Sequence, residues 1–142
     1  MTIVAHTDGA SRGNPGESGI GIRISNEQGQ VLLSLSDYLG IATNNVAEYR
    51  ALLECLRLVR EIQCSNLIVY SDSELMVRQI SGSYKVKDAG LKSYFAEVQQ
   101  ILASAPFTFD IRHVVREENK AADELANRGI NLKRRVLEKN GF

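Results

Sequence analysis

The chain has 142 residues, and its 17 basic and 17 acidic side chains cancel. That length suits one domain over residues 1–142 that buries roughly 68% of its unfolded surface, and the zero net charge disfavours nucleic-acid binding through bulk positive charge. The sequence has no signal-peptide pattern, no apolar run near the ~20 residues of a membrane span, and only two cysteines, which we interpret as reduced thiols of a cytoplasmic protein.

The first half of the sequence predicts an antiparallel meander. The expected elements are a strand over 2–8, a loop over 9–19 rich in glycine, a strand over 19–25 with isoleucine at alternate positions, a turn over 26–29 and a strand over 30–39.

The second half alternates helices and strands. The expected elements are a helix from 45 to about 62, a strand over 66–70, a short helix over 73–80, a loop over 82–90, a helix over 91–105, a strand over 107–115 and a helix from 119 to about 128, followed by a polar tail over about 130–142. The apolar run at 66–70 is typical of a strand buried on both faces in a parallel arrangement. This order of elements therefore predicts an α/β fold with a sheet that is part antiparallel and part parallel.

Four carboxylates lie in four different segments, each where a regular element begins or ends. They are Asp8, Glu48, Asp72 and Asp123. Together they suggest one buried acidic cluster, and such a cluster needs a cation. Hard oxygen ligands without a set of thiolates or imidazoles favour Mg²⁺ or Mn²⁺.

Each acid taken alone also has a purely structural interpretation as an alternative to a metal-binding role. Asp8 precedes a glycine and could initiate a turn, and Asp123 could interact with a helix dipole. Glu48 lies on the inward stripe of its helix, where an unpaired carboxylate is costly, but it could also form a capping box with Asn45.

Asp72 follows the buried strand over 66–70. Ligands of open α/β sheets bind beyond the carboxyl ends of the strands, which is where this residue falls. A capping box formed by Ser71 and Glu74 is compatible with that role.

The strongest sequence signal is a set of short motifs in a fixed order. They are Thr7-Asp8-Gly9 with Gly13-Asn14-Pro15-Gly16, Thr43-Asn44-Asn45 with Ala47-Glu48-Tyr49, Ser71-Asp72-Ser73, and Asn119 with Ala122-Asp123-Glu124-Leu125-Ala126. Through them the chain resembles type 1 ribonucleases H over essentially its whole length. The resemblance implies the ribonuclease H-like fold, with a five-stranded mixed sheet of three antiparallel and then two parallel strands, flanked by helices.

The resemblance also implies an activity. A monomer would hydrolyse the RNA strand of RNA–DNA hybrids, leaving 5′-phosphate and 3′-hydroxyl ends, and the four acids would be catalytic ligands of two Mg²⁺ or Mn²⁺ ions. One ion activates the attacking water and the other stabilises the leaving 3′-oxygen. The expected substrate contacts, some of them to the 2′-hydroxyl that distinguishes RNA, are Asn14, Thr43, Asn44, Asn45 and Glu74; turn and capping chemistry is their alternative.

Two features depart from the family pattern. Many relatives carry a catalytic histidine on the loop before the last acid, whereas this loop offers Arg116 as the candidate replacement, and His6 and His113 are expected to be strand residues. The tryptophan-rich basic protrusion of some relatives is also missing. We expect the basic tail after the last helix to contact the substrate backbone instead. The alternatives are a tail that is solvated and a tail that packs on the domain.

Two other functions remain open at this stage. A catalytically silent nucleic-acid-binding module is disfavoured because anionic groups facing phosphate do not help binding. Another metal-dependent nuclease of the ribonuclease H-like superfamily is disfavoured by the small size of the chain and by the motif Thr43-Asn44-Asn45 three residues before Glu48.

Overall fold

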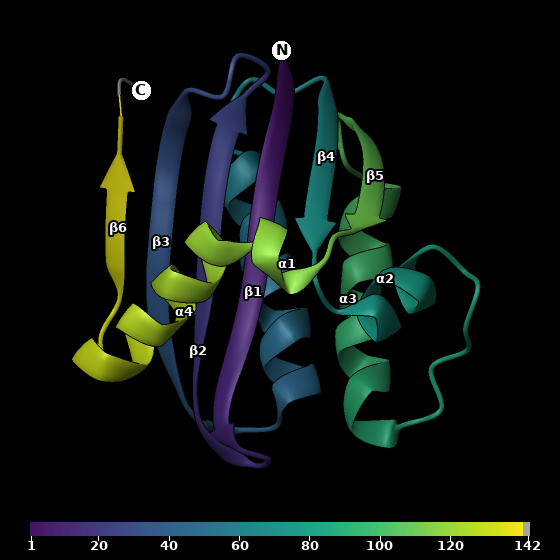
Figure 1. Cartoon of the computed structure of the whole chain (residues 1–142). Coiled ribbons are helices and arrows are strands. Elements are labelled where there is room, and N and C mark those ends of the chain that lie inside the picture. Colours follow the sequence, from purple (N-terminus) through teal and green to yellow (C-terminus); the bar gives the residue numbers. More distant parts are fainter. Residues whose placement is uncertain (141–142) are drawn as a thin grey trace.

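A six-stranded mixed sheet runs through the computed structural model, which describes residues 1–140 (Figure 1). The strands are β1 (Thr2–Gly13), β2 (Gly16–Asn26), β3 (Val31–Ala42), β4 (Asn66–Ser71), β5 (Thr108–His113) and β6 (Val136–Lys139). Their order is β5-β4-β1-β2-β3-β6. The meander β1–β2–β3 is antiparallel, β4 and β5 are parallel to β1, and β6 is antiparallel to β3.

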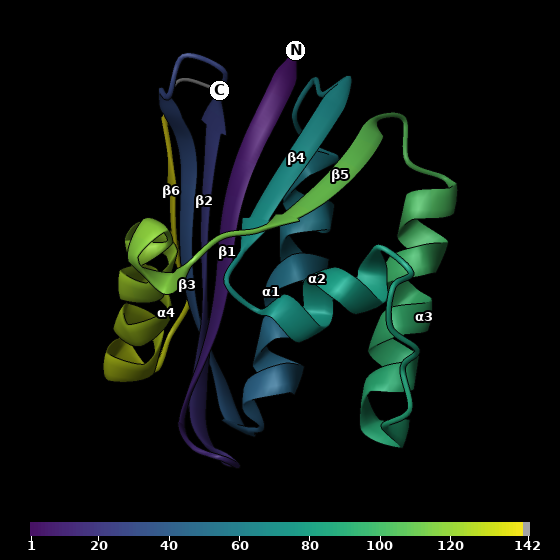
Figure 2. The ribbon, with the colours of Figure 1, turned by 45° about the vertical axis from the view of Figure 1, so that its right-hand side comes forward.

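Helices cover both faces of the sheet. They are α1 (Asn44–Val59), α2 (Glu74–Ile80), α3 (Ala89–Ala103) and α4 (Lys120–Leu132), with a short 3₁₀ turn η1 (Arg116–Glu118) before α4. Figure 2 shows α1, α2 and α3 on one side of the sheet and α4 on the other. Within residues 1–140, no helix is long and apolar enough to cross a lipid bilayer.

The main core lies between the sheet and α1. Alternate side chains of the strands meet the apolar stripe of the helix there, and fully buried members include Ile3, Ile22, Leu35, Leu52, Leu56 and Leu67. At roughly 25 cal/mol per Å² of apolar surface removed from water, this layer supplies the main stabilisation of the fold. The expected fold class is confirmed, with one strand more than the five expected.

The extra strand corrects the expectation of a polar tail over about 130–142. α4 continues to Leu132, and the chain then turns back so that Val136–Lys139 pairs with β3 in the register Leu35↔Leu137. The expectation was wrong because the pairing partner is distant in sequence, and four residues are too few for a periodic signal. Residues 141 and 142 of the expected tail lie outside the described residues.

The expected loop over 9–19 is also wrong. β1 and β2 continue as one long hairpin, with Arg12 opposite Glu17 and a tight turn between Gly13 and Gly16. Gly13 has φ 105°, a conformation that glycine adopts without steric cost. Gly13 and Gly16 mark the turn, whereas Gly9 and Gly19 pair within the strands, with Ile20 and Ala10.

The two capping boxes are corrected as well. Thr43 caps α1 by accepting from the Val46 N–H, at 3.2 Å, and Ser73 caps α2 by accepting from the Met76 N–H, at 3.2 Å. Ser71 instead accepts from the Ser73 N–H at 3.1 Å and so braces the turn that carries the acid between them. Glu48 has no capping role and is available for other chemistry.

Candidate active site

Three acids meet where β1 and β4 run side by side. These strands are parallel with Thr7 opposite Ser71, so Asp8 and Asp72, the next residue of each segment, are neighbours. Glu48 reaches the same point from α1. One carboxylate oxygen of each acid lies within 4.8 Å of the others, and Asp8 and Glu48 are buried.

Gly9 fixes the position of Glu48. Its N–H donates to Glu48 Oε1 at 2.8 Å. A Cβ at this position would overlap the backbone of Ala47 and Glu48, so only glycine lets α1 approach β1 this closely. The bond occupies one carboxylate oxygen and leaves the other to face the remaining acids.

The surroundings of the cluster oppose its ionisation. The pKa of Asp8 is raised, first by burial and then by the charges of Glu48, Asp72 and Asp123. The pKa of Glu48 is raised by burial and by the charge of Asp72, with the Gly9 N–H acting in the opposite direction. Crowded carboxylates of this kind favour either a bound proton or a bound cation.

The donor set fits divalent metal ions. It consists of hard carboxylate oxygens held close together by three separate elements, as Mg²⁺ and Mn²⁺ sites require. Within residues 1–140, these three acids form the one group of close potential ligands. The cluster can therefore hold divalent cations.

Asp123 borders the same hollow from the opposite face of the sheet. It lies in the first turn of α4, and α4 sits close to the sheet because Gly21, the partner of Asp8 across β1 and β2, has no side chain. A Cβ at Gly21 would overlap the backbone of Ala122. All four expected acids thus line one hollow, three of them tightly grouped and Asp123 at the edge.

Arg116 lies beside this fourth acid. Its Nη2 is 3.8 Å from Asp123 Oδ1, and its side chain is 78% exposed. It lines the hollow together with the four acids. This placement leaves the guanidinium free to contact an anionic ligand that approaches the cluster.

The expected substrate contacts fall into two groups. Asn14 Oδ1 accepts from the Asn44 N–H at 3.1 Å, which ties the β1–β2 turn to the start of α1, where Thr43 is the cap. Asn44 itself lines the hollow. These three residues therefore gather at one side of the acids.

The other two lie further out. Asn45 is exposed in the first turn of α1. Glu74 forms an ion pair with Arg78 at 3.1 Å and is not among the residues that line the hollow. The structure thus gives Glu74 a partner on its own helix.

Both histidines are sheet residues, as expected. His6 belongs to β1 and stacks on Tyr70 with ring centroids 5.1 Å apart. His113 ends β5, opposite Ser71. Neither lines the hollow that holds the acids.

Asn127 and Arg12, which the sequence analysis missed, support Asp123, and Asn119 of the last motif holds the helix that carries it. Asn127, one turn later on α4, donates to it, and Arg12 in turn contacts Asn127. Asn119 Nδ2 donates to the Thr7 carbonyl at 2.9 Å and so fastens the start of α4 to β1. The i, i+4 spacing of Asp123 and Asn127 was the available signal.

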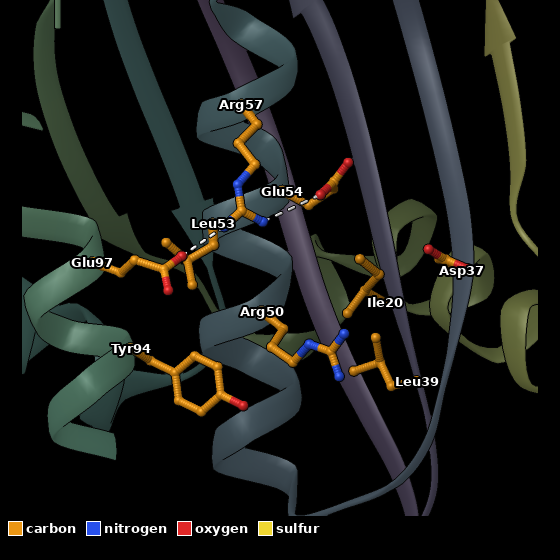
Figure 3. Close-up of a pocket in the computed structure, with 9 residues that line it drawn as sticks. All are labelled: Ile20, Asp37, Leu39, Arg50, Leu53, Glu54, Arg57, Tyr94 and Glu97. Atoms are coloured by element: carbon orange, nitrogen blue, oxygen red, sulfur yellow. Dashed lines mark hydrogen bonds and ion pairs between the residues drawn. The ribbon is translucent and has the colours of Figure 1, made fainter. Parts of the chain in front are cut away.

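A second hollow lies between α1, α3 and β3, on the face of the sheet that α1 covers (Figure 3). Its charged side chains neutralise one another: Arg57 pairs with Glu97 at 2.6 Å and with Glu54 at 3.6 Å. Because these acids already have cationic partners, this hollow lacks the uncompensated negative charge of the first.

Comparisons with known proteins find relatives that are similar to this chain in sequence and in structure. A family model described as "Reverse transcriptase-like" matches residues 6–129. The chain is 31% identical to a ribonuclease H of Chlorobium luteolum, over 92% of this chain and 97% of that protein. It is 39% identical to the bifunctional protein Rv2228c of Mycobacterium tuberculosis, over 89% of this chain but only 35% of that protein. The chain thus spans about a third of the length of that longer relative.

A solved structure extends the likeness to the fold. LC11-RNase H1, determined in complex with an RNA/DNA hybrid, is 42% identical and superposes with a TM-score of 0.88, covering 92% of this chain and 97% of that one.

Proposed function

The chain belongs to the type 1 ribonuclease H family, and on that premise we propose that it cuts the RNA strand of RNA–DNA hybrids internally, leaving 5′-phosphate and 3′-hydroxyl ends. The observation that carries the proposal is the convergence of Asp8, Glu48 and Asp72 within 4.8 Å, with Asp123 on the rim of the same hollow.

We propose that these four acids hold two Mg²⁺ or Mn²⁺ ions. Bound there, the ions would activate the attacking water and stabilise the leaving 3′-oxygen. The chain supplies the geometry: the Gly9 N–H orients Glu48 by holding Oε1, and burial keeps bulk water from screening the acids.

Arg116 is the proposed anion-binding residue of the site. A guanidinium cannot relay a proton at neutral pH, so it does not reproduce a histidine's proton transfer. It can orient the scissile phosphate and stabilise charge that develops there. Its exposed position beside Asp123 supports this role.

Recognition of RNA is assigned to the amides beside the acids. The side chains of Asn44 and Asn45 are exposed at the start of α1, and Asn14 braces that start from the hairpin turn. Thr43 is used as the cap but retains a hydroxyl donor. We propose that this group contacts the hybrid and its 2′-hydroxyls. Glu74 lacks comparable support, because Arg78 engages it.

We also propose that the protein works as a cytoplasmic monomer. All the proposed site residues come from one chain, and the thiols of Cys55 and Cys64 are free, as expected in a reducing compartment.

Cleavage of end-labelled substrates tests the function. An RNA–DNA hybrid should be cut in Mg²⁺ or Mn²⁺ and not in excess chelator, while duplex RNA, duplex DNA and a four-way junction should resist. Cutting of the junction or of duplex DNA would indicate another nuclease of the superfamily. Hybrid binding without any cutting would indicate a silent binding module.

A further inference from the structure

Asp123 lies outside the tight group formed by the other three acids, and an amide one helical turn away holds it. Asn127 Nδ2 donates to the Asp123 carbonyl at 3.0 Å and to Asp123 Oδ1 at 3.3 Å. Arg116 approaches the same carboxylate oxygen, Oδ1, only to 3.8 Å and is largely exposed. The half-buried amide of Asn127 is therefore the firmer of these two contacts.

Arg12 determines which end of that amide faces the acid. An asparagine can present either its oxygen or its NH₂ group to a neighbour. Arg12 Nη2 donates to Asn127 Oδ1 at 3.3 Å and to Asn131 Oδ1 at 2.7 Å. A reversed Asn127 amide would bring its oxygen against the carboxylate and its NH₂ group against the guanidinium, and both contacts would be repulsive.

Arg12 also belongs to the proposed substrate-contacting hairpin. It lies two residues before Asn14, which accepts from the Asn44 N–H. A continuous series of hydrogen bonds therefore leads from the β1–β2 hairpin through Arg12 and Asn127 to Asp123.

We propose that Arg12 and Asn127 are positioning residues that hold the Asp123 carboxylate in the orientation needed to ligate a divalent cation. The inference rests on the proposed function only for its kinetic readout, since the orientation of a metal ligand also affects metal binding without substrate. Residues that orient a metal ligand typically change metal affinity or activity by 10–100-fold when they are removed.

The decisive experiment compares Asn127→Ala, Arg12→Ala and the double variant with wild type. The Mn²⁺ concentration that produces the half-maximal rise in melting temperature is measured without substrate, and the Mn²⁺ concentration for half-maximal hybrid cleavage is measured alongside. Asn127→Ala should raise both concentrations by about 10-fold, with little change in KM for the hybrid. Arg12→Ala should act in the same direction, and more weakly.

The double variant tests whether Arg12 acts through Asn127. If Arg12 acts through Asn127, Arg12→Ala should add nothing in the Asn127→Ala background. Arg12→Lys, which keeps a cationic donor, should retain more of the wild-type metal response than Arg12→Ala. Asn131→Ala is the matched control, because it removes the other bond of Arg12 on the same helix without touching Asp123, and its metal response should equal that of wild type.

Other outcomes would overturn the proposal. Additive effects, or an Arg12→Ala effect confined to KM and to the salt dependence of binding, would make Arg12 a direct substrate contact. An Asn131→Ala response equal to that of Arg12→Ala would reduce the network to a structural tie. If wild type fails to cut the hybrid, the proposed function fails, whereas the thermal response to Mn²⁺ still tests the positioning role.

Discussion

At the scale of single residues, the acids work against the fold when no cation is bound. Asp8 and Glu48 are buried next to each other, and their raised pKa values reflect that repulsion and desolvation. We expect Asp8→Asn to abolish hybrid cleavage while raising the metal-free free energy of unfolding by about 1 kcal/mol or more. Urea unfolding in chelator measures this, and a less stable variant would contradict the clustering of the acids.

The same shifts predict how stability depends on pH. The ordinary pKa values of Asp8 and Glu48 are 3.8 and 4.5, and both are raised in the folded protein. Above those ordinary values the folded state binds more protons than the unfolded state, so the free energy of unfolding should fall as pH rises. Below these ordinary pKa values both carboxyl groups are protonated in the folded and the unfolded state, so they no longer make the free energy of unfolding depend on pH.

Melting temperatures measured in chelator from pH 4 upward check this sign. Saturating Mn²⁺ should reverse the fall at neutral pH, because the bound cation displaces the protons and neutralises the crowded carboxylates. Asp8→Asn should flatten the metal-free profile. A wild-type profile that rises over this range would indicate that other groups dominate.

Substitution of Arg116 should affect catalysis more than hybrid binding. Arg116→Ala should lower kcat roughly 10-fold or more and change hybrid affinity less, because one exposed guanidinium near the cluster contributes little to a long binding surface. Single-turnover cleavage and equilibrium binding in Ca²⁺ separate the two quantities. Arg116→Lys keeps the charge without the planar fork, and full activity in both variants would leave η1 without a chemical role.

At the scale of elements, the sequence predicted those whose signal is local. The apolar spacing of α1 and the buried run of β4 were both recognised, and the four motifs then identified the fold and four acids that line one hollow. The hairpin beyond Gly9 was missed because its glycines and proline were interpreted as a loop, and strand β6 was missed because its partner β3 lies far away in the sequence. The positions of Thr43 and Ser73 as caps could not be separated from neighbouring candidates, since several adjacent polar residues can cap a helix.

The approach of α1 to β1 gives a prediction at this scale. Gly9→Ala places a methyl group against the backbone of Ala47 and Glu48, which cannot move independently of α1. We expect a loss of about 1–3 kcal/mol in the free energy of unfolding and a loss of cleavage, because the Gly9–Glu48 bond is disturbed.

Gly90→Ala is the matched control for that substitution. Gly90 lies in the first turn of α3, and its nearest heavy atom is Asp88 Oδ1 at 3.0 Å from the added methyl, the end of an exposed side chain. Alanine is the better helix former, so stability should hold or rise. Equal losses in the two variants would indicate that the β1–α1 approach is not the cause.

At the scale of the whole molecule, the C-terminal segment joins the two faces of the sheet. Lys133 pairs with Glu17 at 3.1 Å, and Arg135 pairs with Asp37 at 3.3 Å and with Glu54 at 2.8 Å. Lys133 and Arg135 belong to the basic tail that was expected to contact the substrate backbone, and both thus have acidic partners within the protein. The packed alternative for the tail is the one that the structure favours.

The last prediction follows from that arrangement. Deleting residues 133–142 should lower the melting temperature clearly, because it removes β6 with its ion pairs, and should promote self-association by leaving β3 as an exposed edge strand. The slope of log affinity for the hybrid against log salt should stay the same in the truncated protein. If the segment did contact phosphates, each lost contact would change that slope by about 0.9. Two substitutions separate the structural role of this segment from its charge. Arg135→Ala removes two ion pairs and should lower the free energy of unfolding by about 1 kcal/mol or less. Arg134 is exposed, and Arg134→Ala should leave the free energy of unfolding unchanged. A flatter salt slope in the truncated protein or in Arg134→Ala would instead show that this segment binds the hybrid backbone.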